Sequence, residues 1–171
     1  RNQWYDGRND IIRSTDAAIA YLSYLNRKFD GDWLLSLAAY NSGEGTVARA
    51  VSANHAHGKN TDFWALNLPH QARSFVPKFL ALARIFQDAD HTQHLELASA
   101  AEPPEFKALI LPRQITLARA AQLADIDYEL IKRLNTGLKR GVTPPEGPHR
   151  LVLPDAAAER LLAAVAATQA Q

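Results

Sequence analysis

The stretch at residues 36–51, SLAAYNSGEGTVARAV, holds the side chains of this chain that are best suited to bind a ligand. It places Tyr40 and Asn41 directly before Gly43 and Gly45, between two apolar segments with helical spacing. The Asn41 amide can both donate and accept hydrogen bonds, and the glycines let the backbone turn closely beneath a ligand. The same pattern is typical of a plain glycine corner between helices, with Asn41 as a C-cap. From these residues alone, both interpretations stay open.

Glu44 lies inside the same motif, where a carboxyl group would be a tempting general acid. It falls in the first turn of the expected next helix, where the helix dipole stabilises the charged carboxylate and lowers its pKa. A carboxyl group with a lowered pKa is a poor proton donor, so we do not expect Glu44 to be catalytic. Nucleophilic chemistry is not supported either, because the chain has no cysteine and no serine in a histidine–acid arrangement.

The histidines and tryptophans are the remaining candidates. The histidines with close spacing have no acidic partner at metal-ligand spacing, so we expect no metal site; these are His55, His57, His91 and His94. Tryptophan rings can serve as platforms on which sugars stack. Trp33 lies on an apolar helical segment and is predicted to be core, whereas Trp64 fits a core position and a cleft wall equally well. Trp4 is a third candidate platform.

Composition and charge exclude several classes of function. Of the 171 residues, 47% are apolar and 22% are charged, which is typical of a globular protein. The 19 basic and 18 acidic residues leave a formal charge of +1, which gives no field favouring nucleic acid or an anionic membrane. No apolar run approaches the roughly 18 residues of a spanning helix. Because the chain lacks methionine and opens at Arg1, we expect it to be a piece of a larger protein.

The first half of the chain predicts four helices. Ser14 is expected to cap a helix that runs to Phe29, and Asp32 to cap a second, deeply buried helix that ends near Asn41. A third helix is expected to end near residue 54. A fourth is expected over residues 71–87, and it either begins near Ser74 or bends at Pro77. Residues 88–106 are rich in small and polar residues and in proline, and they indicate a linker.

The second half predicts a small unit with the order strand, helix, helix, strand and an extra terminal helix. The strands are expected at residues 107–115 and 150–154. Thr116, Asp127 and Asp155 are expected to cap the three helices, at residues 117–124, at 128–135 and at the C-terminal end.

These segments resemble a known family. Residues 1–87 resemble the later part of the catalytic domain of the lytic transglycosylases of glycoside hydrolase family twenty-three, which have a goose-lysozyme-like fold. The likeness is carried by WYDGRNDI, STDAAIAYLSYLNRKFDGDWLLSLAAYNSGEGTVARAV and DFWALNLPHQARSFVPKFLALA. Residues 107–171 resemble a LysM module, through Thr116–Leu117, Ala121, Ile126, Leu130, Leu134–Asn135 and the later LVLP. The expected fold is mainly α, with an incomplete lysozyme-like helical domain at 1–87, a linker at 88–106 and a βααβ module at 107–171.

The resemblance implies a peptidoglycan lytic transglycosylase. Such an enzyme cleaves the bond between N-acetylmuramic acid and N-acetylglucosamine without water and leaves a 1,6-anhydromuramoyl product. It implies no cofactor, glycan strands as the partner and a periplasmic location, with a lipid anchor upstream as the route to the outer membrane. The family's catalytic glutamate lies in an upstream motif that this sequence lacks, so the chain is expected to hold no catalytic acid and to associate with that missing part.

The resemblance also assigns substrate-binding positions, namely Tyr40, Asn41, Gly43, Gln71 and Phe75. Two of these depart from the family pattern, because Gln71 stands where a glutamate is usual and Phe75 where a tyrosine is usual. Loss of that hydroxyl predicts a weakened or specialised enzyme. Two alternatives remain: a non-catalytic glycan-binding protein, and a fragment that docks on another cell-wall protein through an exposed apolar face.

Overall fold

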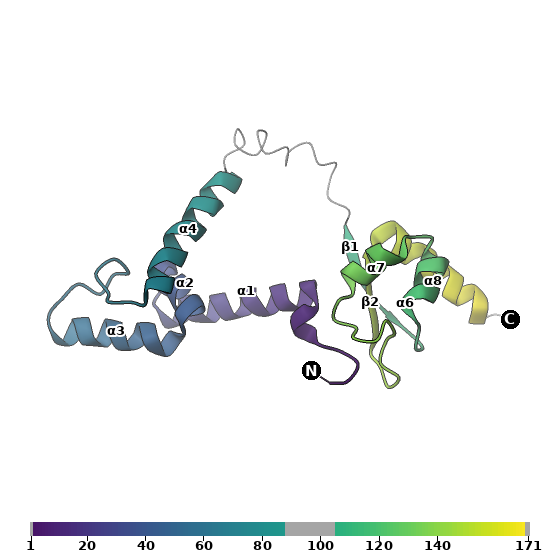
Figure 1. Cartoon of the computed structure of the whole chain (residues 1–171), viewed down its shortest axis with the longest axis horizontal. Helices are drawn as coiled ribbons and strands as arrows, with labels where there is room; N and C mark the ends of the chain where they lie inside the picture. Colours follow the sequence, from purple (N-terminus) through teal and green to yellow (C-terminus); the bar gives the residue numbers. More distant parts are fainter. Residues whose placement is uncertain (1, 88–104, 170–171) are drawn as a thin grey trace. The chain divides into compact units, whose positions relative to one another are not determined.

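The computed structural model describes residues 2–87 and 105–169 (Figure 1). Its elements are η1 (Gly7–Asn9), α1 (Ile11–Lys28), α2 (Trp33–Ser42), α3 (Glu44–Ala56), α4 (His70–Gln87), β1 (Phe106–Leu111), α6 (Leu117–Ala124), α7 (Tyr128–Leu134), β2 (His149–Pro154) and α8 (Asp155–Gln169). The chain is thus mainly helical with one two-stranded sheet, which confirms the predicted fold class. Most of the expected linker at 88–106 lies outside the described residues.

The chain divides into two compact units, and the division falls inside α1. The helical unit is Ala17–Ala101, and the α+β unit combines Arg1–Asp16 with Glu102–Gln171. This division groups the first sixteen residues with the C-terminal part of the chain. The domain boundaries at 1–87, 88–106 and 107–171 stay a prediction.

The helical unit is built around α2, which packs against both α3 and α4. Asp32 caps α2 as predicted, since its side chain accepts hydrogen bonds from the backbone N–H groups of Leu34 and Leu35 at 2.8 and 3.0 Å. The middle of α2, from residue 35 to residue 39, is buried on all sides. Its core neighbours are Leu25 of α1, Val47 of α3, Phe63, Leu66 and Leu68 of the following loop, and Ala72 and Val76 of α4.

Two sequence predictions in this region were wrong. The first helix begins at Ile11 rather than after Ser14, because Asp10 accepts the N–H of Arg13 at 3.0 Å and takes the capping role. The Ser14 hydroxyl instead donates to the Ile11 carbonyl within the helix. Trp33 is 54% exposed rather than core, because it is the first residue of α2 and lies before the buried turns.

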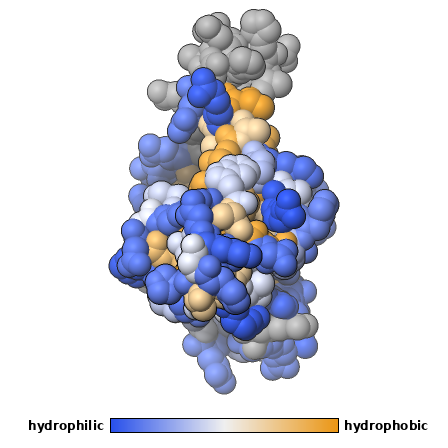
Figure 2. All heavy atoms as spheres, turned by 90° about the vertical axis from the view of Figure 1, so that its left-hand side faces the viewer, coloured by the Kyte–Doolittle hydropathy of each residue, from blue (hydrophilic) through white to orange (hydrophobic). Residues whose placement is uncertain are grey.

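The fourth helix begins at His70, so Pro77 lies in its interior rather than in its first turn. The helix carries many exposed apolar side chains, and Figure 2 shows them gathered along α4. Among the described residues of the helical unit, the exposed large apolar residues are Ile19, Tyr21, Tyr24, Trp33, Tyr40, Trp64, Phe79, Leu80, Leu82 and Phe86. An exposed apolar surface such as the one along α4 is typical of a surface that another protein segment covers.

The α+β unit pairs β1 with β2 as antiparallel strands in a register that sets Leu109 opposite Leu151. The first strand ends at Leu111, before Pro112, and is therefore shorter than predicted. The helix caps Thr116 and Asp127 are confirmed, because their side chains accept from the N–H groups of Arg119 and Leu130. The caps and strands enclose a core of leucine, isoleucine and alanine side chains from α6, α7, α8 and both strands.

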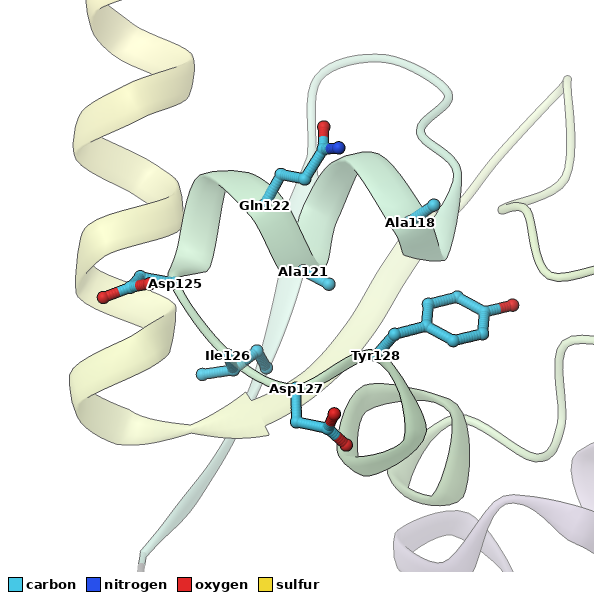
Figure 3. Close-up of a pocket in the computed structure, with 7 residues that line it drawn as sticks. All are labelled: Ala118, Ala121, Gln122, Asp125, Ile126, Asp127 and Tyr128. Atoms are coloured by element: carbon cyan, nitrogen blue, oxygen red, sulfur yellow. The ribbon is translucent and has the colours of Figure 1, made fainter.

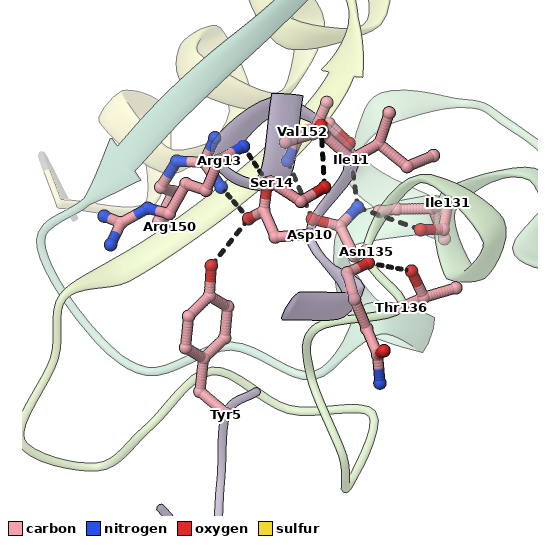
Figure 4. A network of polar contacts seen from close by, with 11 residues as sticks. Tyr5, Asp10, Ile11, Arg13, Ser14, Ile131, Asn135, Thr136, Arg150 and Val152 are labelled. Carbon is pink, nitrogen blue, oxygen red and sulfur yellow. Dashed lines mark hydrogen bonds and ion pairs between the residues drawn. The ribbon is translucent and has the colours of Figure 1, made fainter. Parts of the chain in front are cut away.

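Asn135 ties the end of α7 to the second strand. Its amide nitrogen donates to the carbonyls of Ile131 and Val152 at 2.9 and 2.8 Å, and its Oδ1 accepts the N–H of Val152 at 2.8 Å (Figure 4). The side chain is only 7% exposed, so each of these groups is removed from water. Because buried polar groups need partners, this one amide satisfies backbone groups that the sheet leaves unpaired.

Residues 2–10 pack on this unit. The N–H of Asp6 donates to the Gly137 carbonyl at 2.8 Å, and the N–H of Lys139 donates to the Trp4 carbonyl at 2.9 Å. Asp10, which is 5% exposed, accepts from Arg150 of β2 and from the Tyr5 hydroxyl (Figure 4). The beginning of the chain is thereby held by the loop that precedes β2 and by β2 itself.

We expect Asn135→Ala to lower the free energy of unfolding of the α+β unit by roughly 3 kcal/mol, because it leaves buried backbone groups of Val152 and Ile131 without their hydrogen-bond partner. Guanidinium unfolding, with amide exchange of β2 as the readout, measures this change. The exposed Gln122→Ala in the same unit is the control and should change stability little. An Asn135→Ala protein as stable as the parent would contradict the role given to this amide.

Acid should release residues 2–10. Burial acts to raise the pKa of Asp10, but hydrogen bonds from Arg13 N–H and Tyr5 and the charge of Arg150 outweigh it, so the pKa is lowered. A lowered folded-state pKa stabilises the docked segment above the ordinary range of an aspartate, and this stability is lost as pH falls through the folded value. An NMR titration that follows the Tyr5 signals should show the release, and Asp10→Asn should abolish its pH dependence. Asp16→Asn is the control, and an unchanged titration in Asp10→Asn would refute this account.

Candidate functional site

The corner between α2 and α3 is formed by Gly43. Its φ is +88°, a region that disfavours residues with a side chain, and its N–H donates to the Ala39 carbonyl at 2.8 Å to close the last turn of α2. Gly43 is therefore the C-cap, and the interpretation of Asn41 as the cap was wrong. Asn41 instead lies in the last turn of α2, beside Tyr40, where the glycine corner ends the helix.

Asn41 carries an atom that the described residues leave unpartnered. Its Oδ1 is buried and has no hydrogen-bond donor among the described groups, unlike the neighbouring Ser42, whose hydroxyl donates to the Ala38 carbonyl at 2.7 Å. Buried acceptors without partners are rare in native structures and each calls for an explanation. An acceptor held in this state at the end of α2 is suited to a donor from outside the described residues.

Three exposed tyrosines lie beside this corner. Tyr40 of α2 lies 6.0 Å from Tyr21 of α1 between ring centroids, and Tyr21 is stacked on Tyr24 at 6.0 Å with a 13° interplanar angle. Each ring is 40–42% exposed. The row forms an aromatic surface of the kind on which the apolar faces of sugar rings pack. Sequence reasoning identified Tyr40 but missed Tyr21 and Tyr24, although their spacing of three on one helix face was a usable signal.

Glu44 is paired rather than poised as an acid. Its Oε1 accepts from Lys28 Nζ at 2.8 Å, and this hydrogen bond lowers the pKa of the Glu44 carboxyl group. The direction of the shift confirms the prediction, while the identified cause is the lysine rather than the helix dipole. Glu44 is therefore a charged carboxylate that fixes the start of α3 to the end of α1.

The other two predicted site residues lie on α4, which packs against α2. Gln71 is exposed in the first turn, and Phe75 is half-buried one turn later. The Phe75 ring lies 6.0 Å from that of Phe79 and packs on the core of the helical unit. Whether these residues contact substrate stays a prediction. Trp64, which the sequence left open, is 65% exposed with its ring edge-on to Phe63.

The α+β unit has its own hollows. One of about 450 Å³ lies at the turn between α6 and α7; it is lined by Ala118 and Ala121 of α6 and by Tyr128 at the start of α7 (Figure 3). Gln122, Asp125 and Asp127 add polar groups at its edge. In residues 2–87 and 105–169, no group of three or more histidine, aspartate or glutamate side chains is arranged to hold a metal ion. His91 and His94 lie outside the described residues.

Comparison with known families bears on both units. Residues 1–63 match the model described as "Transglycosylase SLT domain", and residues 105–170 match that described as "Lytic transglycosylase MltD, LysM-like domain". The first match contains the Tyr40–Gly43 corner and the docked residues 2–10. The second contains the sheet, its helices and the hollow at α6 and α7.

Known relatives agree with these matches. Over 157 residues the chain is 39% identical to "Membrane-bound lytic murein transglycosylase D" of Escherichia coli K12, and equally to that of Escherichia coli O6:H1. These alignments cover 92% of this chain and 34% of the relatives, so the chain spans about a third of their length. It is also 57% identical over 49 residues to a "Putative tributyltin chloride resistance protein" of Alteromonas, covering 29% of this chain and 24% of the relative. Both units therefore match domains of lytic transglycosylases, residues 1–63 the transglycosylase SLT domain and residues 105–170 the LysM-like domain.

Proposed function

We propose that the protein containing this chain cleaves peptidoglycan glycan strands between N-acetylmuramic acid and N-acetylglucosamine and leaves 1,6-anhydromuramoyl ends. The observation that carries the proposal is the match of residues 1–63 to the SLT domain, which includes Asn41, whose buried Oδ1 has no partner among the described residues. The name of the Escherichia coli relatives, a murein transglycosylase, supports the same substrate.

The proposed reaction needs one acid and no water. A glutamic acid upstream of this chain would protonate the leaving oxygen of N-acetylglucosamine as the glycosidic bond breaks. The 6-hydroxyl of the muramic acid would then attack its own anomeric carbon and return a proton to the glutamate. Ordinary glycosidases use two carboxyl groups because one must serve the water or act as the nucleophile. An internal hydroxyl removes that need.

The residues of this chain would bind and orient the strand. The Asn41 Oδ1, buried and unpartnered, can accept the N–H of a sugar N-acetyl group, and the exposed rings of Tyr40, Tyr21 and Tyr24 can pack against sugar faces. Glu44 is held as an anion by Lys28, so proton transfer is assigned to the upstream residue. Gly43 would set the angle at which α2 presents Asn41.

The exposed apolar face of the helical unit is proposed to pack against the rest of the SLT domain. The exposed apolar side chains of this unit include tyrosines of α1 and α2 and phenylalanines and leucines of α4. Large apolar side chains in water cost free energy that burial recovers at about 25 cal/mol per Å². The chain spans 34% of the length of its relatives, and a protein of their length would have such a remainder.

A second candidate function is non-catalytic binding of peptidoglycan. The LysM-like match over residues 105–170 favours it, as do Gln71 and Phe75, which lack the charge and the hydroxyl of the family pattern. In either case we propose a periplasmic location with an upstream lipid anchor. Among the helices of the described residues, none is both long and apolar enough to cross a membrane.

Digestion of purified peptidoglycan by the full-length protein separates the two functions. Mass spectrometry should show 1,6-anhydro muropeptides from the full-length protein and none from the 171-residue chain alone. Full-length protein that binds peptidoglycan without releasing such products would establish the binding function instead.

We expect Asn41→Ala in the full-length protein to lower kcat/KM about tenfold to a hundredfold, since it removes a positioning hydrogen bond to the reacting sugar. The neighbouring Ser42→Ala is the matched control, because its hydroxyl bonds only within α2 in the described structure. Release of soluble muropeptides gives the rate. Equal rates for the two variants would show that Asn41 is not part of the substrate-binding site.

Phe75→Tyr should raise the rate of the full-length protein about tenfold if a hydroxyl at this position stabilises the catalytic acid. Phe79→Tyr places the same hydroxyl one turn along α4, on the ring 6.0 Å away, and should have no such effect. An unchanged rate in Phe75→Tyr would show that the departure from the family pattern does not weaken the enzyme.

A further inference from the structure

A second hollow of the α+β unit, of about 620 Å³, lies between α7 and the loop that follows it. We call it the basic groove, and its lining includes Lys132, Lys139, Arg140, Tyr128, Leu117 and Asn9. Asn9 comes from the docked segment at the start of the chain, so the groove is complete only when residues 2–10 are in place. It is distinct from the corner of the helical unit described above.

The wall formed by the docked segment is closely fitted. The Thr136 hydroxyl donates a hydrogen bond to the Asn9 carbonyl, and Lys139 Nζ donates one to the Asn2 carbonyl at 3.0 Å. A Cβ at Gly137 would lie 2.8 Å from Tyr5 Cε2, closer than real Cβ contacts, and 3.3 Å from the Asp6 carbonyl oxygen, which is tighter than most of them. Position 137 therefore needs glycine for the segment to seat.

The charges that line the groove have one sign. The lining carries three cations and no carboxylate, in a chain whose overall formal charge is only +1. Lys132 forms an ion pair with Glu129, whose Oε1 lies 3.3 Å from the lysine Nζ. Lys139 contacts a neutral carbonyl. The Arg140 guanidinium lies 4.6 Å from the centroid of the Trp4 ring, and this uncharged ring holds the guanidinium in place without neutralising its charge.

The groove also offers apolar surface. Leu117 and Leu138 form a buried floor, and the ring of Tyr128 is 42% exposed. Lys132 Nζ lies 5.9 Å from the centroid of that ring, so a cation and an aromatic face are presented together. Sugar rings pack on aromatic faces, while lysine and arginine donors bind carboxylates. The combination suits a glycan that carries carboxylates.

We propose that the basic groove binds peptidoglycan strands through the carboxylates of their lactyl-linked stem peptides, and so prefers peptide-bearing strands to neutral N-acetylglucosamine polymers. This inference rests on the proposed action on peptidoglycan and adds to it the chemical feature that the second unit recognises. The docked segment is a structural part of this groove.

The test compares two probes by isothermal titration with the 171-residue chain. One is a soluble peptidoglycan tetrasaccharide with its stem peptides, and the other is a tetramer of N-acetylglucosamine. The peptide-bearing probe should bind more tightly, and added salt should reduce the difference. Lys132→Gln and Lys139→Gln should each weaken its binding by roughly threefold to fivefold. Arg133→Gln, on the same helix but outside the groove lining, is the matched control and should leave binding unchanged.

Gly137→Val tests the contribution of the docked segment. It should unseat residues 2–10 and weaken the peptide-bearing probe, while amide exchange of β1 and β2 shows that the sheet stays folded. Equal affinity for the two probes, or an equal loss in Arg133→Gln, would overturn the proposal even if full-length protein releases anhydro muropeptides. The opposite result is also informative. If the full-length protein has no lytic activity, but the peptide-bearing probe still binds more tightly and the lysine variants lose that difference, the lytic function is overturned and the proposed binding by the basic groove stands.

Discussion

The buried carboxylate of Asp10 joins parts of the chain that are far apart in sequence. It caps the first turn of α1, accepts the Tyr5 hydroxyl and pairs with Arg150, 140 residues away. A carboxylate removed from water is costly unless it is paired and hydrogen-bonded. All of its partners must therefore be in place together, which commits the beginning of the chain to β2. Burial and the same carboxylate raise the pKa of Tyr5 to about 12, so the hydroxyl stays protonated and able to donate well into the alkaline range.

This constraint changes how the two family matches are understood. Residues 2–10 lie within the SLT match, yet they fold with the unit that carries the LysM-like match. The C-terminal unit is therefore more than an independent module. It supplies the binding partner for a stretch of transglycosylase sequence, and that stretch in turn forms a wall of the basic groove. Removing either piece would expose Asp6 and Asp10, which are each 5% exposed in the structure.

Local features were predictable from sequence, and distant pairings were not. Asp32, Thr116 and Asp127 cap their helices as predicted, because a cap depends on residues within about four positions. The capping role of Asp10 was missed and given to Ser14, although the capping bond to the N–H of Arg13 is local; the pairing of Asp10 with Arg150, 140 residues away, is the part that no local pattern predicts. Both strands and the glycine corner were found from short motifs. The row of Tyr21, Tyr24 and Tyr40 needed the packing of α1 beside α2, and Trp33 was misplaced because an apolar helix does not reveal which end is exposed.

The chemistry at the α2–α3 corner follows from what Lys28 does to Glu44. An ion pair at 2.8 Å favours the charged carboxylate, so this group is unsuited to give up a proton to a leaving oxygen. The neighbouring Asn41 is neutral, and its buried acceptor can only receive a hydrogen bond. The described corner is thus suited to a neutral hydrogen-bond donor, as the proposed function requires, while the three cations of the basic groove are suited to anions. A strand with both N-acetyl groups and peptide carboxylates would offer one feature to each surface, and this complementarity is the physical reason why we propose peptidoglycan as the ligand of both.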